Sequence, residues 1–230
     1  MLVLAAAVLP ALSAVSGRSL KRHAASGLLR RYLYIIVRGV LISLVILAGW
    51  RWMGRPYSAL GLDVPVGFPG RVGFGFDVVF FGYYAFGLFI RKLPPGRVAF
   101  AQKRLDSFRI MPRTQAQFAL FPVVAIAGSV CEELLYRGFL IWLFAPIAGP
   151  LVAAAISALL FGLGHIYQGW LNVLRTAAVG LLFGAGFVLT HSLWWLIVAH
   201  VMANVFGGLF ARRLTRLAPA NDGSMPGSIP

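Results

Sequence analysis

Long apolar stretches, separated by short basic segments, restrict this chain to folds that are built within a membrane. About 20 apolar residues suffice for an α-helix to cross the hydrocarbon core of a bilayer. Only 12% of the residues are charged, far below the share in soluble domains, so a soluble fold would leave much apolar surface uncovered. With no pattern typical of strands, the sequence predicts an all-α fold, a polytopic transmembrane helical bundle of about seven spanning helices. The predicted spans are residues 1–16, 32–50, 74–90, 114–144, 147–164, 173–190 and 192–211.

The first of these stretches, residues 1–16, has two interpretations, a spanning helix or a signal peptide. A signal peptide begins with a positively charged region. That region is missing here, and basic residues follow the apolar run instead. The sequence therefore favours a first spanning helix whose N-terminus lies outside.

The formal net charge of +15 comes from short runs beside the apolar stretches rather than from a basic domain. Such runs mark the cytoplasmic loops of membrane proteins, and no separate domain remains that could bind nucleic acid. One crossing per helix places residues 17–31, 91–113 and 212–216 together in the cytoplasm, where 91–113 could form an interfacial helix on anionic headgroups. We expect a multi-pass integral membrane protein, in the cytoplasmic membrane if it is prokaryotic, with lipids and not nucleic acid as partners.

The chain is expected to form a single membrane domain with three parts. Residues 1–113 hold the N-terminal helices and the basic segment. Residues 114–212 form a helical core that contains the candidate functional residues. Residues 213–230 are polar and rich in Gly, Pro and Ser, which predicts a disordered tail.

Charged side chains are rare in the helical core, since residues 114–211 contain only Glu132, Glu133, Arg137 and Arg175. A carboxylate inside a spanning helix is unfavourable unless it is paired or hydrated. Glu133 and Arg137 are four residues apart, so they share a helix face and can form an ion pair. Glu132 is rotated by about 100° from its neighbour, and needs a second partner or a role as a general base.

The N-terminal spans contain two further charged residues, Arg38 and Asp77. Arg38 lies near enough to one end of its predicted span for the side chain to reach the interface. An ion pair between Arg38 and Asp77 within the bundle is the structural interpretation of both residues.

Two histidines offer partners for the unpaired glutamate. His165 ends an apolar stretch one helical turn after Phe161, and His200 lies in the last predicted span, where Asn204 shares its helix face. Buried polar groups in lipid must satisfy one another. We therefore expect Glu132, the two histidines and Asn204 to surround one cavity.

In chain order these residues form three motifs: EExxxR at residues 132–137, FxxxH at 161–165 and HxxxN at 200–204. The set resembles the CAAX-protease and bacteriocin-processing family of intramembrane proteases, to which the prenyl-protein endopeptidase Rce1 belongs. One motif alone could arise by chance, but three in order, each in an apolar helix, are a specific signal. The resemblance covers about residues 120–210.

The resemblance implies hydrolysis of a peptide bond in a membrane-embedded cavity. Glu132 with His165 would activate a water molecule, and His200 with Asn204 would hold the oxyanion that develops in the transition state. The rest of the EExxxR motif would support the architecture. The implied substrate is a peptide or protein, lipidated or not, and its sequence does not follow from the family.

Zinc is the cofactor that these residues could hold. Glu132, His165 and His200 would be its ligands, and they make an acceptable zinc set, although no HExxH helix presents them. The alternative is that the glutamate and the histidine activate water without a metal.

Two other functions would use the same residues. The chain could be a non-catalytic membrane scaffold or a bacteriocin-immunity protein that keeps the polar cavity, or it could be an ion-coupled transporter. Transporters commonly show inverted repeats and broken helices, which this sequence does not display. The sequence does not distinguish the scaffold from the enzyme, because the presence of intact catalytic residues permits activity but does not require it.

Overall fold

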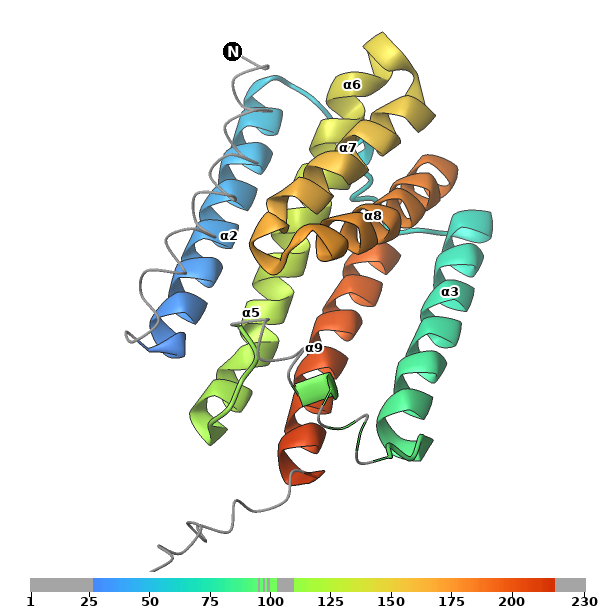
Figure 1. The fold of residues 1–230 in the computed structure, drawn as a ribbon. Helices are drawn as coiled ribbons and strands as arrows, with labels where there is room; N and C mark the ends of the chain where they lie inside the picture. The colour runs from blue at the N-terminus through green and yellow to red at the C-terminus, as the bar shows by residue number, and fades with distance from the viewer. Residues whose placement is uncertain (1–26, 95, 97, 99, 103–109, 218–230) are drawn as a thin grey trace, which may run out of the picture.

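The computed structural model describes residues 27–94, 96, 98, 100–102 and 110–217 (Figure 1). All regular elements within these residues are helices, and no strand occurs among them. This confirms the prediction of an all-α bundle. In chain order the elements are α2 (Leu28–Trp52), the 3₁₀ turn η1 (Tyr57–Leu60), α3 (Gly67–Ala85), the π-helix η2 (Phe86–Ile90), α5 (Gln115–Glu133), the π-helix η3 (Leu134–Leu140), α6 (Ile141–Ala148), α7 (Pro150–Gly164), the 3₁₀ turn η4 (Ile166–Gln168), α8 (Trp170–Thr190) and α9 (Trp194–Leu217).

Five helices in the described part of the chain are long and apolar enough to cross a membrane. They are Leu28–Trp52, Gly67–Ile90, Gln115–Ala148, Trp170–Thr190 and Trp194–Leu214. Each coincides with a predicted span. The first predicted span, residues 1–16, lies outside the described residues.

The helix α7 differs from its prediction as a full span. Its 15 residues extend about 22 Å, less than the roughly 30 Å of the hydrocarbon core. In Figure 1 it descends from α6 only to about the middle of the bundle, where a short turn leads into α8, which rises again. One full crossing per helix is therefore wrong for α7, because local hydrophobicity does not set the depth at which a helix ends.

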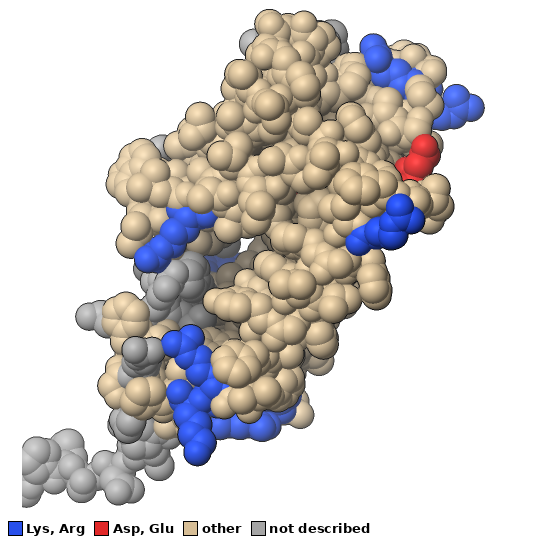
Figure 2. Space-filling view, turned by 90° about the vertical axis from the view of Figure 1, so that its right-hand side faces the viewer, with Lys and Arg blue, Asp and Glu red and all other residues tan. Residues whose placement is uncertain are grey.

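Basic helix ends gather on one side of the bundle. In Figure 1 the start of α2, the end of α3, the start of α5 and the end of α9 all lie at the lower end. Figure 2 shows a group of Lys and Arg side chains there, together with further ones in the middle and at the upper end of the molecule. Because α7 and α8 form a hairpin, the start of α5 and the end of α9 lie on the same side, as the sequence predicts. That this side faces the cytoplasm stays a prediction.

Local signals set several helix boundaries. The hydroxyl of Thr114 accepts a hydrogen bond from the backbone N–H of Gln117, whose side chain accepts one from the N–H of Thr114, which makes a capping box before α5. Gly149 and Gly169 have φ angles of 81° and 97°. Glycine adopts such angles without strain, so the chain can turn sharply before α7 and before α8.

The two N-terminal spans are longer than predicted. Because α2 already begins at Leu28, Arg38 lies well inside the helix rather than near its end. The helix α3 begins at Gly67 and includes Pro69 in its first turn, where the missing N–H of proline is not needed. The predicted span began only at residue 74 because it did not allow for a proline at this position.

The last helix also extends further than predicted, because α9 continues to Leu217. The first residues of the predicted tail, 213–230, are therefore helical. Arg213 holds this end in place, since its guanidinium donates hydrogen bonds to the carbonyl oxygens of Gly87 at 3.1 Å and Arg91 at 2.8 Å. The rest of the predicted tail lies outside the described residues.

Small residues let α7 and α8 pack closely, as in many membrane helix pairs. A Cβ atom on Gly162 would lie 2.7 Å from the carbonyl oxygen of Val173, and one on Gly180 would lie 3.1 Å from the ring of Phe161. This close approach holds the end of α7 within the bundle, which places His165 at mid-depth.

The largest buried cluster surrounds the π-helix η3, whose seven residues are all buried. It includes Trp50 from α2, Phe183 from α8 and Trp195 from α9. The segment directly after the two glutamates is therefore the most enclosed part of the molecule.

Candidate active site

Glu133 and Arg137 form a buried ion pair within one helix. Nη1 of Arg137 lies 2.9 Å from Oε1 of Glu133, and the exposed fractions of the two side chains are 1% and 0%. Nη2 of Arg137 also donates to the carbonyl oxygen of Gly180 on α8 at 3.5 Å. The ion pair predicted from the spacing of four residues is present.

Two aromatic rings enclose the guanidinium of Arg137. Its central carbon lies 4.4 Å from the ring centre of Phe161 and 5.4 Å from that of Phe183, both within the range of cation–π attraction. Phe161 is the phenylalanine of the FxxxH motif, so one role of that residue is to stabilise the ion pair. Phe183 was not predicted, since no spacing in the sequence connects it with Arg137.

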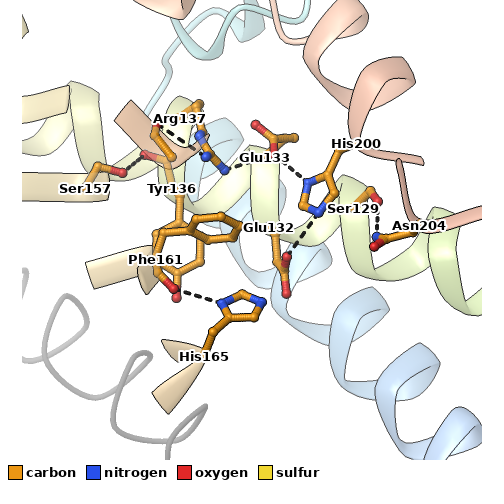
Figure 3. A network of polar contacts seen from close by, with 11 residues as sticks. Ser129, Glu132, Glu133, Tyr136, Arg137, Ser157, Phe161, His165, His200 and Asn204 are labelled. Atoms are coloured by element: carbon orange, nitrogen blue, oxygen red, sulfur yellow. Dashed lines mark hydrogen bonds and ion pairs between the residues drawn. The ribbon is translucent and has the colours of Figure 1, made fainter. Parts of the chain in front are cut away.

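His200 lies between the two glutamates (Figure 3). Its Nδ1 is 2.7 Å from Oε1 of Glu133, and its Nε2 is 3.6 Å from Oε2 of Glu132. An ionised carboxylate only accepts hydrogen bonds, so Nδ1 carries the hydrogen of the shorter contact. His200 thereby connects α9 to the helix that carries the glutamates.

Glu132 has a different environment from its neighbour, with 26% of its side chain exposed. It faces a cavity of about 620 Å³ that His165, His200 and Asn204 also line. The four residues expected to converge therefore surround one cavity. Their catalytic roles stay predictions.

His165 stands directly after the end of α7, where the chain turns toward α8. Its Nδ1 lies 2.9 Å from the carbonyl oxygen of Phe161. A carbonyl oxygen can only accept, so Nδ1 carries a hydrogen and the neutral ring has its lone pair on Nε2. In Figure 3 the ring of His165 and the carboxylate of Glu132 point toward each other, and both line the cavity.

Asn204 lies one helical turn after His200 and contacts the helix of the glutamates. Its Nδ2 donates to the hydroxyl oxygen of Ser129 at 3.2 Å, and Ser129 is fully buried. Sequence reasoning missed this serine. Its position four residues before Glu133, on the same helix face, was the signal that could have identified it.

Three arginines, Arg31, Arg38 and Arg175, line other parts of the cavity. The predicted ion pair between Arg38 and Asp77 is wrong, because Figure 1 shows α2 and α3 at opposite edges of the bundle. Oδ1 of Asp77 is buried without a hydrogen-bond partner. Periodicity places each residue on a helix but does not say which helices are neighbours.

The helix that carries the glutamates changes from α to π geometry directly after Glu133. Such wider turns are rare and frequently occur at functional sites. The sequence did not predict this one, since no residue pattern distinguishes a π-turn from an α-turn.

The proposed zinc ligands do not form a metal site in this arrangement. No group of three His, Cys, Asp or Glu side chains that could hold a metal ion occurs in the described part of the chain. Nδ1 of His200 is bonded to Glu133, and Nδ1 of His165 is bonded to a backbone carbonyl, so Nε2 is the ring atom that could bind a metal in each case. Dependence on zinc stays a prediction.

Residues 114–206 match the family model described as Type II CAAX prenyl endopeptidase Rce1-like. No curated protein and no solved structure gave a match to the chain. The matched segment begins at the cap of α5 and includes all three motifs and the four cavity residues. The five long apolar helices, together with this match, identify the chain as an integral membrane protein. Residues 114–206 are therefore similar to Rce1-like type II CAAX prenyl endopeptidases, in line with the resemblance that the three motifs indicate.

Proposed function

We propose that this protein is an intramembrane endopeptidase in which Glu132, together with His165, activates a water molecule for attack on a peptide bond. The observation that carries the proposal is the difference between the two glutamates. Arg137 and His200 both bond to Glu133. Glu132 has only a longer contact of 3.6 Å with His200, and 26% of its side chain is exposed, so a substrate carbonyl and a water molecule in the cavity can reach its carboxylate.

The proposed reaction needs one proton acceptor and one group that orients the water. Glu132 takes a proton from water as the oxygen attacks the carbonyl carbon, and the Nε2 lone pair of His165 accepts a hydrogen bond from the hydrogen that stays on that oxygen. The C–N bond then breaks, and Glu132 returns the proton to the leaving nitrogen. General acid–base catalysis of this kind contributes about 10²- to 10⁴-fold to a rate.

His200 and Asn204 are proposed to stabilise the oxyanion. Nδ1 of His200 already donates to Glu133, so a protonated ring would offer the N–H at Nε2 to the cavity. Asn204 bonds to Ser129 with its amide nitrogen, and the second hydrogen of that nitrogen is the proposed donor to the substrate oxygen.

The proposed substrate is a membrane-associated peptide or protein, and a prenylated peptide is the first to test because the matched family model bears that name. Apolar residues from several helices line much of the cavity, among them Phe80 of α3, Val124 of α5, and Val179 and Leu182 of α8. Such walls suit a substrate that carries lipid or apolar side chains.

The test uses the full chain, purified and reconstituted into liposomes. Internally quenched peptides, with and without a farnesylated cysteine, are added, and the products are identified by mass spectrometry. Glu132→Gln should abolish cleavage while the folded yield stays the same. Asp77→Asn is the matched control, because it makes the same carboxylate-to-amide change in a spanning helix outside the cavity lining.

Cleavage that survives Glu132→Gln would contradict the proposed base. A wild-type protein that binds these peptides and hydrolyses none of them would favour the non-catalytic scaffold instead.

A further inference from the structure

One oxygen of Glu133 receives both of its hydrogen bonds. Oε1 is 2.9 Å from Nη1 of Arg137 and 2.7 Å from Nδ1 of His200, whereas Oε2 is buried without a partner. Neutralising Arg137 does not require a contact between Glu133 and His200 of α9, so this second hydrogen bond points to an additional role. Glu133 thus joins the ion pair to the ring that faces the cavity.

The partner of one imidazole nitrogen determines what the other nitrogen can do. A carboxylate at Nδ1 holds the hydrogen on that atom and fixes the orientation of the ring. For His200 this directs Nε2 toward the cavity and Glu132. The rings of Phe161 and Phe183 meet the imidazole of His200 edge-on, with ring centres 6.1 Å and 6.2 Å away. These two neighbours pack against the imidazole and form no hydrogen bond with it.

We propose that Glu133 is a positioning residue for His200, and that Arg137 orients the oxygen to which His200 donates. The proposal rests on the proposed function, since it assigns His200 a part in hydrolysis. Arg137 has a defined role in it, because its bond to Oε1 keeps that atom turned toward both donors.

The shared oxygen allows a substitution that keeps the acceptor and removes the charge. In a Glu133→Gln variant the amide oxygen can replace Oε1, and Arg137 opposes a flip because its own N–H would then meet the amide N–H. The NH₂ group would occupy the place of Oε2, which has no hydrogen bond to lose. The variant leaves Arg137 without a carboxylate, so its Tm should fall, while the folded protein should keep kcat within about tenfold of wild type.

Removing the acceptor should have a larger effect. In the Glu133→Leu/Arg137→Met variant both ends of the buried pair become apolar, so no unpaired charge remains to unfold the protein. We expect kcat to fall by about 10²-fold through misplacement of His200, with little change in KM or Tm. Glu133→Gln/Arg137→Met should also lose about 10²-fold, because the amide can then flip and donate to the ring.

A spectroscopic measurement tests the same contact without relying on activity. The chain contains four histidines, His23, His165, His191 and His200, and ¹⁵N labelling of their rings followed by NMR reports which nitrogen carries hydrogen. The Leu/Met double variant should change the signals of His200, assigned from a His200→Gln sample. The signals of His165 should not change, since its Nδ1 bonds to a backbone carbonyl.

The outcomes separate the two proposals. Normal kcat in the folded Leu/Met variant, or unchanged His200 signals, would overturn the positioning role. A Glu133→Gln variant that is folded but as inactive as the Leu/Met variant would overturn it too, because charge rather than acceptor geometry would then be decisive. A wild-type protein without peptidase activity would refute the proposed function, while the NMR result would still decide whether Glu133 holds the ring.

Discussion

Glu132 and Glu133 are adjacent in the chain, yet 26% of the first side chain is exposed and none of the second. Both residues line the cavity, but Arg137 and His200 enclose Glu133, whereas the carboxylate of Glu132 stays accessible. The turn of about 100° between consecutive helical residues thus separates a buried ion-pair partner from an accessible carboxylate.

His165→Ala should lower kcat by at least about 10²-fold, because the water would lose the acceptor that orients it. Peptide hydrolysis by the reconstituted protein measures the effect. The control is His191→Asn, a change in a turn with φ of 48°, an angle that asparagine tolerates. Equal activity of His165→Ala and the control would remove His165 from the mechanism.

Asn204→Ala should lower kcat by about 10²- to 10³-fold through loss of an oxyanion donor, with little change in KM. Ser129→Ala should cause a smaller loss, because Ser129 only accepts a hydrogen bond from Asn204. Steady-state kinetics of both variants provide the comparison. A large rise in KM with normal kcat would mean that Asn204 binds substrate and does not act in the transition state.

Arg137→Ala should destabilise the fold, because it leaves Glu133 buried without its cation. Breaking one side of such a pair typically costs about 3–5 kcal/mol. Thermal unfolding in detergent, together with the yield of monodisperse protein, measures this. Arg175→Ala is the control, since Arg175 is exposed. A stable Arg137→Ala protein would show that the ion pair contributes little.

Cysteine labelling tests the arrangement of the helix ends. In a Cys131→Ala background, which removes the one native cysteine, Lys92→Cys and Arg216→Cys should be accessible from the same side of the membrane. Asp63→Cys, in the loop between α2 and α3, should be accessible from the other side. The predicted orientation places the first two in the cytoplasm, and labelling of Lys92→Cys and Arg216→Cys from opposite sides would refute the topology.

A chelator distinguishes a zinc-dependent mechanism of water activation from a metal-free one. Since Glu132, His165 and His200 do not form a ligand group, we expect hydrolysis to continue in 1,10-phenanthroline and the purified protein to lack stoichiometric zinc. Loss of activity in the chelator, with recovery on adding zinc, would instead support the predicted zinc site.

Local periodicity explains why much of the site could be predicted. Residues four apart on a helix share a face whatever the fold, so Glu133 with Arg137 and His200 with Asn204 followed from sequence spacing alone. Long-range contacts have no such rule. The bond from His200 to Glu133 and the one from Asn204 to Ser129 connect residues 67 and 75 positions apart.

The sequence by itself determined that this protein lies in a membrane, where most of its helices run, and which polar residues must meet, because lipid tolerates few unpaired charges. Only the tertiary structure decided that α7 stops at mid-depth, that Arg38 borders the cavity and that His200 bonds to Glu133. These features depend on how closely whole helices approach one another. That approach is set by side-chain packing between distant segments, such as Gly162 against Val173, and hydrophobic periodicity along one helix carries no information about it.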